Sequence, residues 1–183
     1  MLEVPEELFT GRLTLKMPQT GHAGQVLEAI HASKPELERW LSFAQTRPRL
    51  EECEARLRRR QARFLLREAL DYELFERSTR RFVGRADLVR LDWRVRKFEI
   101  GFWLDSGFTG HGLMLEAVCA LTDLAFGRLG ARRVENVCDE RNAGSRKVAE
   151  QAGFALEGIL RNNALDAQDP ALWINDCLYA RVR

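Results

Sequence analysis

Two glycine-containing segments of this chain have residue types and spacings suited to binding a phosphorylated ligand. The first, Asp105–Met114, reads Asp-Ser-Gly-Phe-Thr-Gly-His-Gly-Leu-Met and lies between an apolar run and a helical pattern. Backbone N–H groups converge where a helix begins, and the positive end of the helix dipole lies at the same place, so such an end attracts phosphate. Gly107, Gly110 and Gly112 allow positive φ angles and close approach of a ligand. The spacing matches neither a Walker loop nor a dinucleotide-binding fingerprint. A helix cap without a ligand is the alternative.

The second segment begins at Asn142 and continues to Gly153-Phe154. Asn142 is suited to be the N-cap of a short helix, and Ser145 lies near the first turn of that helix. Capping alone explains both residues, and contact with a ligand is the other interpretation. Arg146 and Lys147 are placed to meet either a ligand phosphate or water.

Composition and charge exclude several classes of protein. The chain has 183 residues, of which 45% are hydrophobic, so it fits one domain with a real core. A net charge of +2, with 31% charged residues of both signs, is typical of a soluble protein and not of a strongly basic nucleic-acid binder. The arginines of segment 56–63 lie among Glu51, Glu52 and Glu54 on a helical pattern. They are interpreted as a solvated helix face, so direct contact with nucleic acid is not expected.

The cysteines predict a reduced, cytoplasmic protein without a metal site. They are widely spaced, form no CxxC pair and are accompanied by no histidines at metal-ligand spacing: Cys53, Cys119, Cys138 and Cys177. The N-terminal residues 1–9 are acidic and contain no apolar segment long enough for a signal peptide or a membrane span. Neither export nor a membrane partner is expected.

Hydrophobic periodicity predicts a single domain over residues 1–183 in which helices and strands are mixed. The expected elements are a strand over 12–17, helices near 23–34 and 50–64, strands over 72–75, 82–91 and 98–104, a helix over 112–128, a strand over 133–138, a helix over 145–151, and strands over 154–160 and 172–182. The 112–128 helix should bury Met114, Ala117, Val118, Leu121, Leu124 and Ala125. The order β-α-α-β-β-β-α-β-α-β-β indicates an α/β (α+β) fold that is mixed and not doubly wound.

This element order and four sequence features together resemble a GNAT superfamily N-acetyltransferase. The features are the strand Phe98–Leu104, the loop Gly110-x-Gly112, the pair Asn142-x-x-Ser145, and the stretch Gly153-Phe154-x-x-Glu157-Gly158. Within the superfamily the chain is most similar to the Rim-type group, which acetylates N-terminal amines of ribosomal proteins. Thr10-x-Arg12-Leu13-x-Leu15 and Trp173-x-x-Asp176 also fit, so the resemblance covers nearly the whole chain. It implies a central mixed, mostly antiparallel sheet of about seven strands, splayed in the middle and flanked by about four helices.

The resemblance implies acetyl-CoA as the co-substrate and no metal. Gly101 interrupts an otherwise good strand, which marks a bulge, a close backbone approach or a purely structural kink. In the family the strand splays here, and the freed amides, those of Phe102, Trp103 and Leu104 in this chain, hydrogen-bond the pantetheine arm and the thioester carbonyl. Donors of this kind contribute roughly 3 kcal/mol each in acyl-transfer enzymes. The pyrophosphate would be held by the backbone N–H groups of Thr109, Gly110, His111, Gly112, Leu113 and Met114. Thr109 and Met114 depart from the usual superfamily residues, so cofactor affinity can be lower.

The same resemblance names catalytic candidates. Asn142 would contact the cofactor arm, and Ser145 would protonate the leaving thiolate. Glu99 is the carboxylate nearest to the expected reaction centre and is therefore the candidate general base, although pairing with Arg96, Lys97 or another arginine explains it equally well. Some relatives are thought to use a glutamate just beyond the Glu157-Gly158 pair, but segment 161–165 contains none. Asp166, the closest carboxylate, is interpreted as a turn residue.

The acceptor is predicted from the free energy needed to deprotonate an amine. An α-amine with a pKa of about 7.7 to 8.0 loses about 1 kcal/mol at pH 7, whereas a lysine at about 10.4 loses about 4.6 kcal/mol. Because the sequence shows no clear base, the N-terminal α-amine of a protein, ribosomal by the resemblance, is the easier acceptor. A small-molecule amine stays open, as does a homodimer. A non-catalytic acyl-CoA-binding protein is the alternative from another class.

Overall fold

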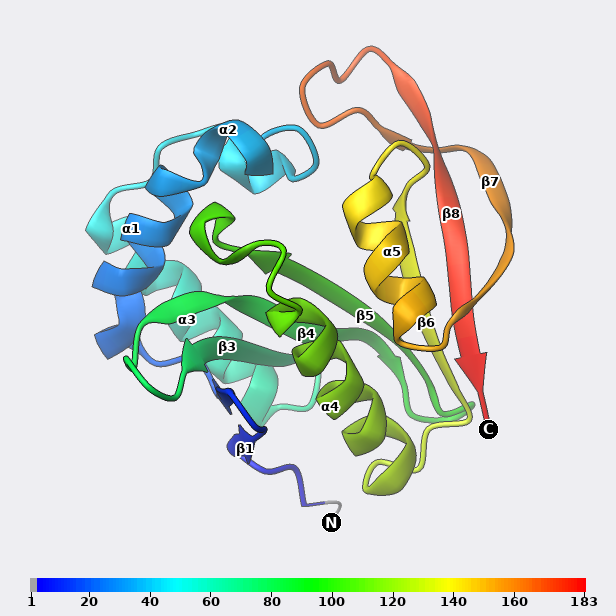
Figure 1. Ribbon diagram of the computed structural model, residues 1–183, viewed down its shortest axis with the longest axis horizontal. Helices are drawn as coiled ribbons and strands as arrows, with labels where there is room; N and C mark the ends of the chain where they lie inside the picture. The colour runs from blue at the N-terminus through cyan, green and yellow to red at the C-terminus, as the bar shows by residue number, and fades with distance from the viewer. Residues whose placement is uncertain (1–2) are drawn as a thin grey trace.

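The computed structural model describes residues 3–183, which form one mixed sheet covered by helices on both faces (Figure 1). The strands are β1 (Glu7–Phe9), β2 (Leu13–Lys16), β3 (Leu70–Glu76), β4 (Phe82–Asp92), β5 (Lys97–Leu104), β6 (Arg133–Asp139), β7 (Ala155–Leu165) and β8 (Trp173–Val182). The helices are α1 (Ala23–Ala32), α2 (Lys34–Leu37), α3 (Leu50–Leu65), α4 (Leu113–Gly127) and α5 (Ala143–Gln151). Within residues 3–183, no helix combines the length and the apolar composition needed to cross a membrane.

The sheet has the strand order β1-β2-β3-β4-β5-β6-β8-β7, and every neighbouring pair is antiparallel except β5 and β6. These two strands pair in parallel only over Lys97↔Arg133, Phe98↔Val134 and Glu99↔Glu135. Beyond that point each continues without the other. The sheet therefore splits in its middle, as the mixed, mostly antiparallel GNAT fold predicted from the sequence requires.

Two short elements were not predicted, so the sheet has eight strands where about seven were expected, and the chain has five α-helices where about four were expected. Strand β1 has three residues and no buried side chain, so it shows no alternation that a pattern search can use. Helix α1 ends at Ala32, and Pro35 lies in the first turn of α2. Proline is tolerated there because the N–H that it lacks has no intrahelical partner.

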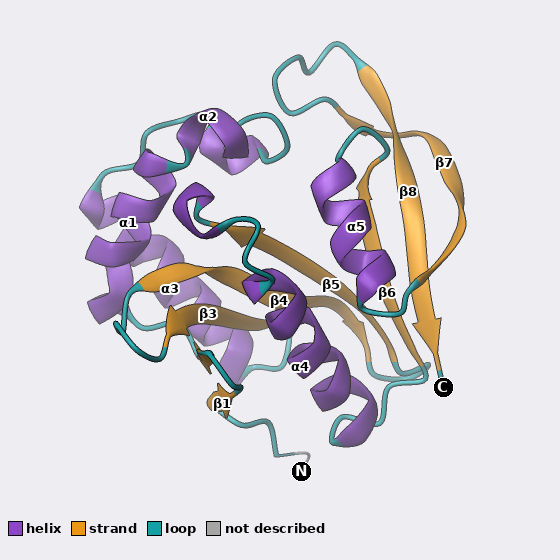
Figure 2. Ribbon diagram, viewed as in Figure 1, coloured by secondary structure: helices purple, strands orange, loops and turns teal. Residues whose placement is uncertain are grey.

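Helices α4 and α5 cover one face of the sheet, and α1 and α3 cover the other (Figure 2). The apolar stripe predicted for α4 is confirmed, because all six residues of that stripe are buried in the larger core cluster against β4, β5 and β6. A second core cluster lies on the opposite face. There, side chains of α1 and α3 pack around Phe75, Phe82 and Trp103.

Residues 34–41, which comprise α2 and the turn after it, are called the α2 segment. This segment and the tip of the β7–β8 hairpin lie at the same end of the molecule, on either side of the split between β5 and β6 (Figure 1). The two segments are far apart in sequence, but residues 39–41 line one cavity together with Ala164, Leu165 and Ala167. The fold thus gathers loops from both halves of the chain at the place where the sheet opens.

Candidate active site

A cavity of about 260 Å³ occupies the split between β5 and β6. Its walls come from both strands, from the start of α5, from the α2 segment and from the β7–β8 hairpin. The lining residues that matter below are Trp40, Leu41, Gly101, Phe102, Asn136, Cys138, Asp139, Asn142, Ser145, Ala164, Leu165 and Asp176. The second glycine-marked segment thus borders the cavity through Asn142 and Ser145, whereas no residue of the first, Asp105–Met114, belongs to its lining.

Backbone groups of β5 point into the split at alternate residues. The N–H of Asp105 donates to the Val83 carbonyl of β4 at 2.8 Å, whereas the carbonyl of Ile100 accepts from Asn136 of β6 at 2.9 Å. Because successive residues of an extended strand direct their N–H and C=O groups to opposite edges, Phe102 and Leu104 face the split. The N–H groups of these two residues therefore lie on the edge of β5 that faces the split, and Phe102 also lines the cavity.

Trp103 is placed differently from the prediction. By the same alternation its N–H and C=O face β4, opposite Arg85, and not the split. Its indole is 5% exposed and packs against Phe82 and Phe43 in the second core cluster. Trp103 therefore supports the strand from behind, and it does not offer a main-chain donor to a ligand in the cavity.

Asn136 on β6 spans the split and was missed by sequence reasoning. Its side chain is 3% exposed, and its Nδ2 donates to the Ile100 carbonyl at 2.9 Å. Its Oδ1 is fully buried and has no hydrogen-bond donor among residues 3–183. A buried acceptor without a donor is costly, so this oxygen is suited to receive an N–H from a ligand in the cavity. A polar residue between Val134 and Val137 was the available signal.

The glycine loop leads from β5 into α4 and leaves its main chain exposed. Gly110 and Gly112 have φ angles of 81° and 74°, in the left-handed region that favours glycine. Gly112 is the N-cap of α4, and no side chain caps the helix. The side chains of Leu113 and Met114 are buried, so these two residues can contact a ligand through N–H groups alone.

Thr109 closes the turn that precedes these glycines. Its hydroxyl donates to the Ser106 carbonyl at 2.9 Å, and its N–H donates to the same oxygen at 3.3 Å. Its amide is thus already engaged. Exposed Gly110, His111 and Gly112 follow it directly, so the loop that presents open amides is shorter than the predicted one.

The loop is held from one side by Arg12 and Glu116, which the sequence did not single out as a pair. Arg12 Nη1 donates to the His111 carbonyl at 2.8 Å, and Arg12 Nε donates to Glu116 Oε2 at 2.7 Å. Thr10 Oγ1 and the Arg12 N–H donate to the other oxygen of Glu116 at 2.6 and 2.7 Å. Burial raises the pKa of Glu116, but these hydrogen bonds outweigh it and the pKa is lowered.

We expect Arg12→Met to weaken acetyl-CoA binding about tenfold, because the charge-assisted hydrogen bonds that fix His111 contribute roughly 1.5–3 kcal/mol. Isothermal titration with CoA measures the change. Arg77→Met is the matched control, since Arg77 Nη1 donates to the nearby Thr10 carbonyl at 2.8 Å without contacting the glycine loop. Equal affinities for the two variants would show that Arg12 does not position the loop.

Asn142 and Ser145 both line the cavity, and the cap predicted from the sequence is present. Asn142 Oδ1 accepts from the Ser145 N–H at 3.0 Å. Burial raises the pKa of the neighbouring Cys138 thiol to about 11, and a hydrogen bond from Ser145 opposes that rise. The Ser145 hydroxyl therefore lies next to a sulfur atom inside the cavity.

Glu99, the candidate base, is not brought to this cavity. It belongs to the last parallel pair before the split, opposite Glu135, and its Oε2 accepts from Arg90 Nη1 at 2.8 Å. Burial raises the pKa of Glu99, and Arg90 lowers it in part. The ion pair that was the alternative interpretation is present, and Glu99 does not belong to the lining.

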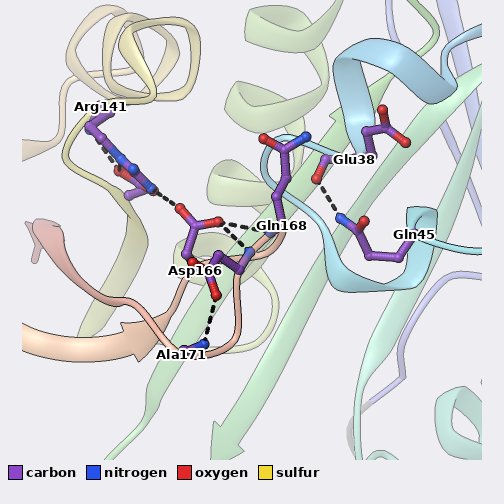
Figure 3. A network of polar contacts seen from close by, with 8 residues as sticks. Glu38, Gln45, Arg141, Asp166, Gln168 and Ala171 are labelled. Atoms are coloured by element: carbon purple, nitrogen blue, oxygen red, sulfur yellow. Dashed lines mark hydrogen bonds and ion pairs between the residues drawn. The ribbon is translucent and has the colours of Figure 1, made fainter.

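Asp166 is a turn residue, as expected, and it also anchors the hairpin. It accepts from the N–H groups of Gln168 and Asp169 at 2.8 and 3.0 Å, and Arg141 Nη2 donates to it at 2.6 Å (Figure 3). Arg141 also binds Asp139 at the end of β6. The tip of the hairpin is thereby tied to the cavity wall. Across residues 3–183, no three histidine, cysteine, aspartate or glutamate side chains gather as they would around a metal ion.

Comparison with known proteins agrees with this geometry. Residues 12–155 match the acetyltransferase (GNAT) domain, and the chain belongs to that family. It is 37% identical over 97 residues to the probable N-acetyltransferase YjcK of Bacillus subtilis. This alignment covers 52% of this chain and 54% of that protein. It is 31% identical over 105 residues to the ribosomal-protein-serine acetyltransferase of Escherichia coli, covering 55% and 54%. The chain thus spans about half the length of these two relatives.

The fold itself is shared over a greater length. A structure of RimL, the ribosomal L7/L12 alpha-N-protein acetyltransferase, in complex with coenzyme A superposes with a TM-score of 0.87 at 23% identity, covering 98% of this chain and 97% of that one. This structure shows the shared fold, and the Escherichia coli sequence relative agrees with the Rim-type resemblance.

Proposed function

We propose that the protein transfers an acetyl group from acetyl-CoA to a primary amine, and that the amine is the N-terminal α-amine of a protein. The observation that carries this proposal is the open edge of β5, where Phe102 and Asn136 line one cavity and the Oδ1 of Asn136 has no hydrogen-bond donor among residues 3–183. An amide-containing arm can accept from the Phe102 N–H and donate to Asn136 Oδ1. A purely structural kink at Gly101 explains neither feature.

The residues fit acetyl-CoA along the whole loop-to-cavity path. The amides of Gly110 to Met114 would hold the pyrophosphate at the uncapped start of α4, and Asn136 and Phe102 would hold the pantetheine arm. Gly101 lines the same cavity, and a Cβ atom built on it meets no atom within 4 Å. The strand thus leaves open space at the place where the arm would pass.

Acetyl-CoA supplies the activated acetyl group, which a neutral amine takes by direct attack on the thioester, releasing the CoA thiol. The Phe102 or Leu104 N–H steadies the oxygen that becomes negative during the attack, by an amount of about 3 kcal/mol. The bond between nitrogen and the acetyl carbon forms, the carbon–sulfur bond breaks, and the nitrogen loses one proton to water. Ser145 donates a proton to the departing sulfur and is reprotonated from water.

A protein N-terminus is favoured over a lysine because the deprotonation of its α-amine costs less free energy. The sequence relatives include a ribosomal-protein-serine acetyltransferase, which supports a ribosomal protein as the acceptor. The cavity opens between the α2 segment, with Trp40 and Leu41, and the hairpin, with Ala164 and Leu165. An extended peptide end is suited to enter between two such segments.

The test is release of CoA thiol from acetyl-CoA with a panel of acceptors: peptides that begin with serine, alanine or methionine, the same peptides with blocked N-termini, a polyamine and an aminoglycoside. Turnover only with free N-terminal peptides supports the proposal. Turnover confined to the polyamine or the aminoglycoside would assign a small-molecule acceptor. Tight CoA binding with no turnover on any amine would instead favour an acyl-CoA-binding protein.

We expect Ser145→Ala to lower kcat about ten- to a hundredfold while leaving the KM for acetyl-CoA unchanged, because the departing sulfur loses its proton donor. The helix start survives, since Asn142 binds the main-chain N–H of residue 145 and not its hydroxyl. Ser78→Ala, in the exposed β3–β4 turn, is the matched control. A kcat equal to that of the control would exclude Ser145 as the acid.

A further inference from the structure

Asp176 of β8 is a carboxylate on the wall of the cavity that the sequence did not assign to the site. It lies directly opposite Asp139 of β6 in the antiparallel register, so the two side chains project from the same face. Both residues line the cavity. Two adjacent carboxylates repel each other unless a cation compensates them.

Only one of the two carboxylates is compensated within the chain. Arg141 Nη2 donates to Asp139 at 2.5 Å and its Nε donates at 3.0 Å, and this arginine also binds Asp166. Asp176 is 6% exposed and forms no ion pair with any residue in the range 3–183. The only hydrogen bond to its side chain there comes from Asn163 Nδ2, to Oδ2 at 2.8 Å. A carboxylate this buried is normally paired with a cation.

The chain bends to orient this carboxylate. The β7–β8 register shifts between Leu160 and Ala164, and Asn162 within the shift has a φ of 50°, in the left-handed region. The N–H of Asn162 donates to Asn175 Oδ1 at 3.0 Å, which fixes the irregular segment against β8. Asn163 then reaches Oδ2 of Asp176 and leaves Oδ1 without a donor. Bulges and strained backbone often occur next to active sites, where they aim a side chain.

We propose that Asp176 binds the positively charged amino group of the acceptor in the cavity that Phe102 and Ser145 also line. This inference rests on the proposed function and adds the group that recognises the acceptor. A primary ammonium supplies the missing cation and an N–H donor for Oδ1, and it loses one proton to water before it attacks the thioester as the neutral amine. Asp139 does not compete for the ammonium, because Arg141 already neutralises it. The carboxylate missing from segment 161–165 is thus provided by the neighbouring strand.

The decisive variant is Asp176→Asn, which keeps the shape of the side chain and an acceptor for Asn163. With the best peptide acceptor of the panel, we expect its KM to rise about ten- to a hundredfold while the affinity for acetyl-CoA stays unchanged. Asp169→Asn is the matched control, since it removes one negative charge from the exposed tip of the same hairpin, and the asparagine oxygen can still accept from the Ala171 N–H. Asp176→Glu restores the charge on a longer arm and should recover part of the loss.

A binding measurement on the CoA complex separates recognition of charge from structural damage. The wild-type complex should bind a peptide with a free N-terminus at least about tenfold more tightly than its N-acetylated form, and Asp176→Asn should bind both equally. The variant should melt at the same temperature as the wild type or higher, because a buried, unpaired charge has been removed. A merely structural role would lower the melting temperature and leave the preference for the free N-terminus intact.

The outcomes distinguish this inference from the function on which it rests. A wild type that turns over no amine overturns both. A wild type that acetylates peptides, together with an Asp176→Asn variant of unchanged acceptor KM, overturns the role of Asp176 alone. Equal wild-type affinity for free and acetylated peptides also overturns it, without any variant.

Discussion

Gly84→Ala should destabilise the protein by about 3 kcal/mol or more, because β4 and β5 approach each other too closely for any side chain at this position. A Cβ atom built on Gly84 would lie 2.4 Å from the Trp103 carbonyl oxygen and 2.9 Å from the Leu104 Cα atom, and both neighbours are backbone. The residue also has a φ of 155°, which side-chain-bearing residues rarely adopt. Either β5 moves away or Gly84 changes conformation. Urea denaturation followed by circular dichroism measures the loss.

Gly101→Ala is the control, because it makes the same chemical change on the strand that pairs with β4. A Cβ atom at Gly101 meets no atom within 4 Å. We expect its stability to stay within about 0.5 kcal/mol of the wild type. Equal losses for the two variants would contradict the close approach at Gly84. A Cβ atom at Gly84 would displace β5, the strand that carries Phe102 and Leu104. The Gly84→Ala protein should therefore also bind CoA more weakly.

The parts of this fold that depend on local pattern could be predicted from the sequence. The apolar spacing of α4 marks its buried side correctly, and the run Phe98–Leu104 marks β5 to within one residue. Such features need only neighbours a few positions away. The short elements β1 and α2 could not be predicted in this way, since three or four residues carry too little periodicity.

The parts of the site that depend on register and on long-range contacts could not be predicted. Arg12 and Glu116 are 104 positions apart, and nothing local links them. Glu99 lies beside the split in sequence, yet it pairs with Arg90 outside the cavity. Trp103 is adjacent to two cavity-facing amides, but strand alternation turns its own amide to β4. Asp176 enters the site only because β8 pairs with β6 in one particular register.

The opening of the sheet also explains where the charges of the site lie. Beyond Glu99 and Glu135, β6 loses its partner on β5, and Asn136 replaces main-chain pairing with one side-chain hydrogen bond. The polar groups that this leaves unpaired face the cavity, where a ligand can satisfy them. On the closed part of the sheet, only other residues of the chain can compensate a buried carboxylate, as Arg85 does for Asp87 and His22 for Glu73. Where this compensation is incomplete, the cost of burying the charge lowers the stability of the folded chain.

Stability should fall as the pH rises from about 5 to about 8, because Asp71 and Asp87 are buried side by side on β3 and β4. Burial raises the pKa of Asp71 to about 7, and the neighbouring Asp87 adds to the rise. Burial raises the pKa of Asp87 to about 7 as well, against the lowering influence of Arg60 and Arg63, and although Arg85 Nε lies 2.7 Å from Asp87 Oδ2. Asp71 Oδ2 and Asp87 Oδ1 have no hydrogen-bond donor among residues 3–183.

The sign follows from proton binding. With an ordinary pKa of 3.8 in the unfolded chain, the folded state holds more protons between pH 3.8 and about 7, so the free energy of unfolding decreases as pH rises through that window. One such carboxyl contributes up to about 4 kcal/mol. Glu73 and Glu99, whose pKa values burial also raises, act in the same direction. Asp139 and Asp166 have lowered pKa values and stay ionised in both states above pH 5.

Asp71→Asn should flatten this dependence, since it removes one titrating group and the charge that repels Asp87. Urea midpoints at several pH values between about 5 and about 8 measure the slope. Asp92→Asn is the matched control on β4: its side chain is exposed, and the N–H groups of Arg94 and Val95 already lower its pKa. That variant should keep the wild-type slope. A wild type equally stable at both ends of the range, or an Asp71→Asn variant with the wild-type slope, would show that the two buried carboxyls are not the groups that titrate on unfolding.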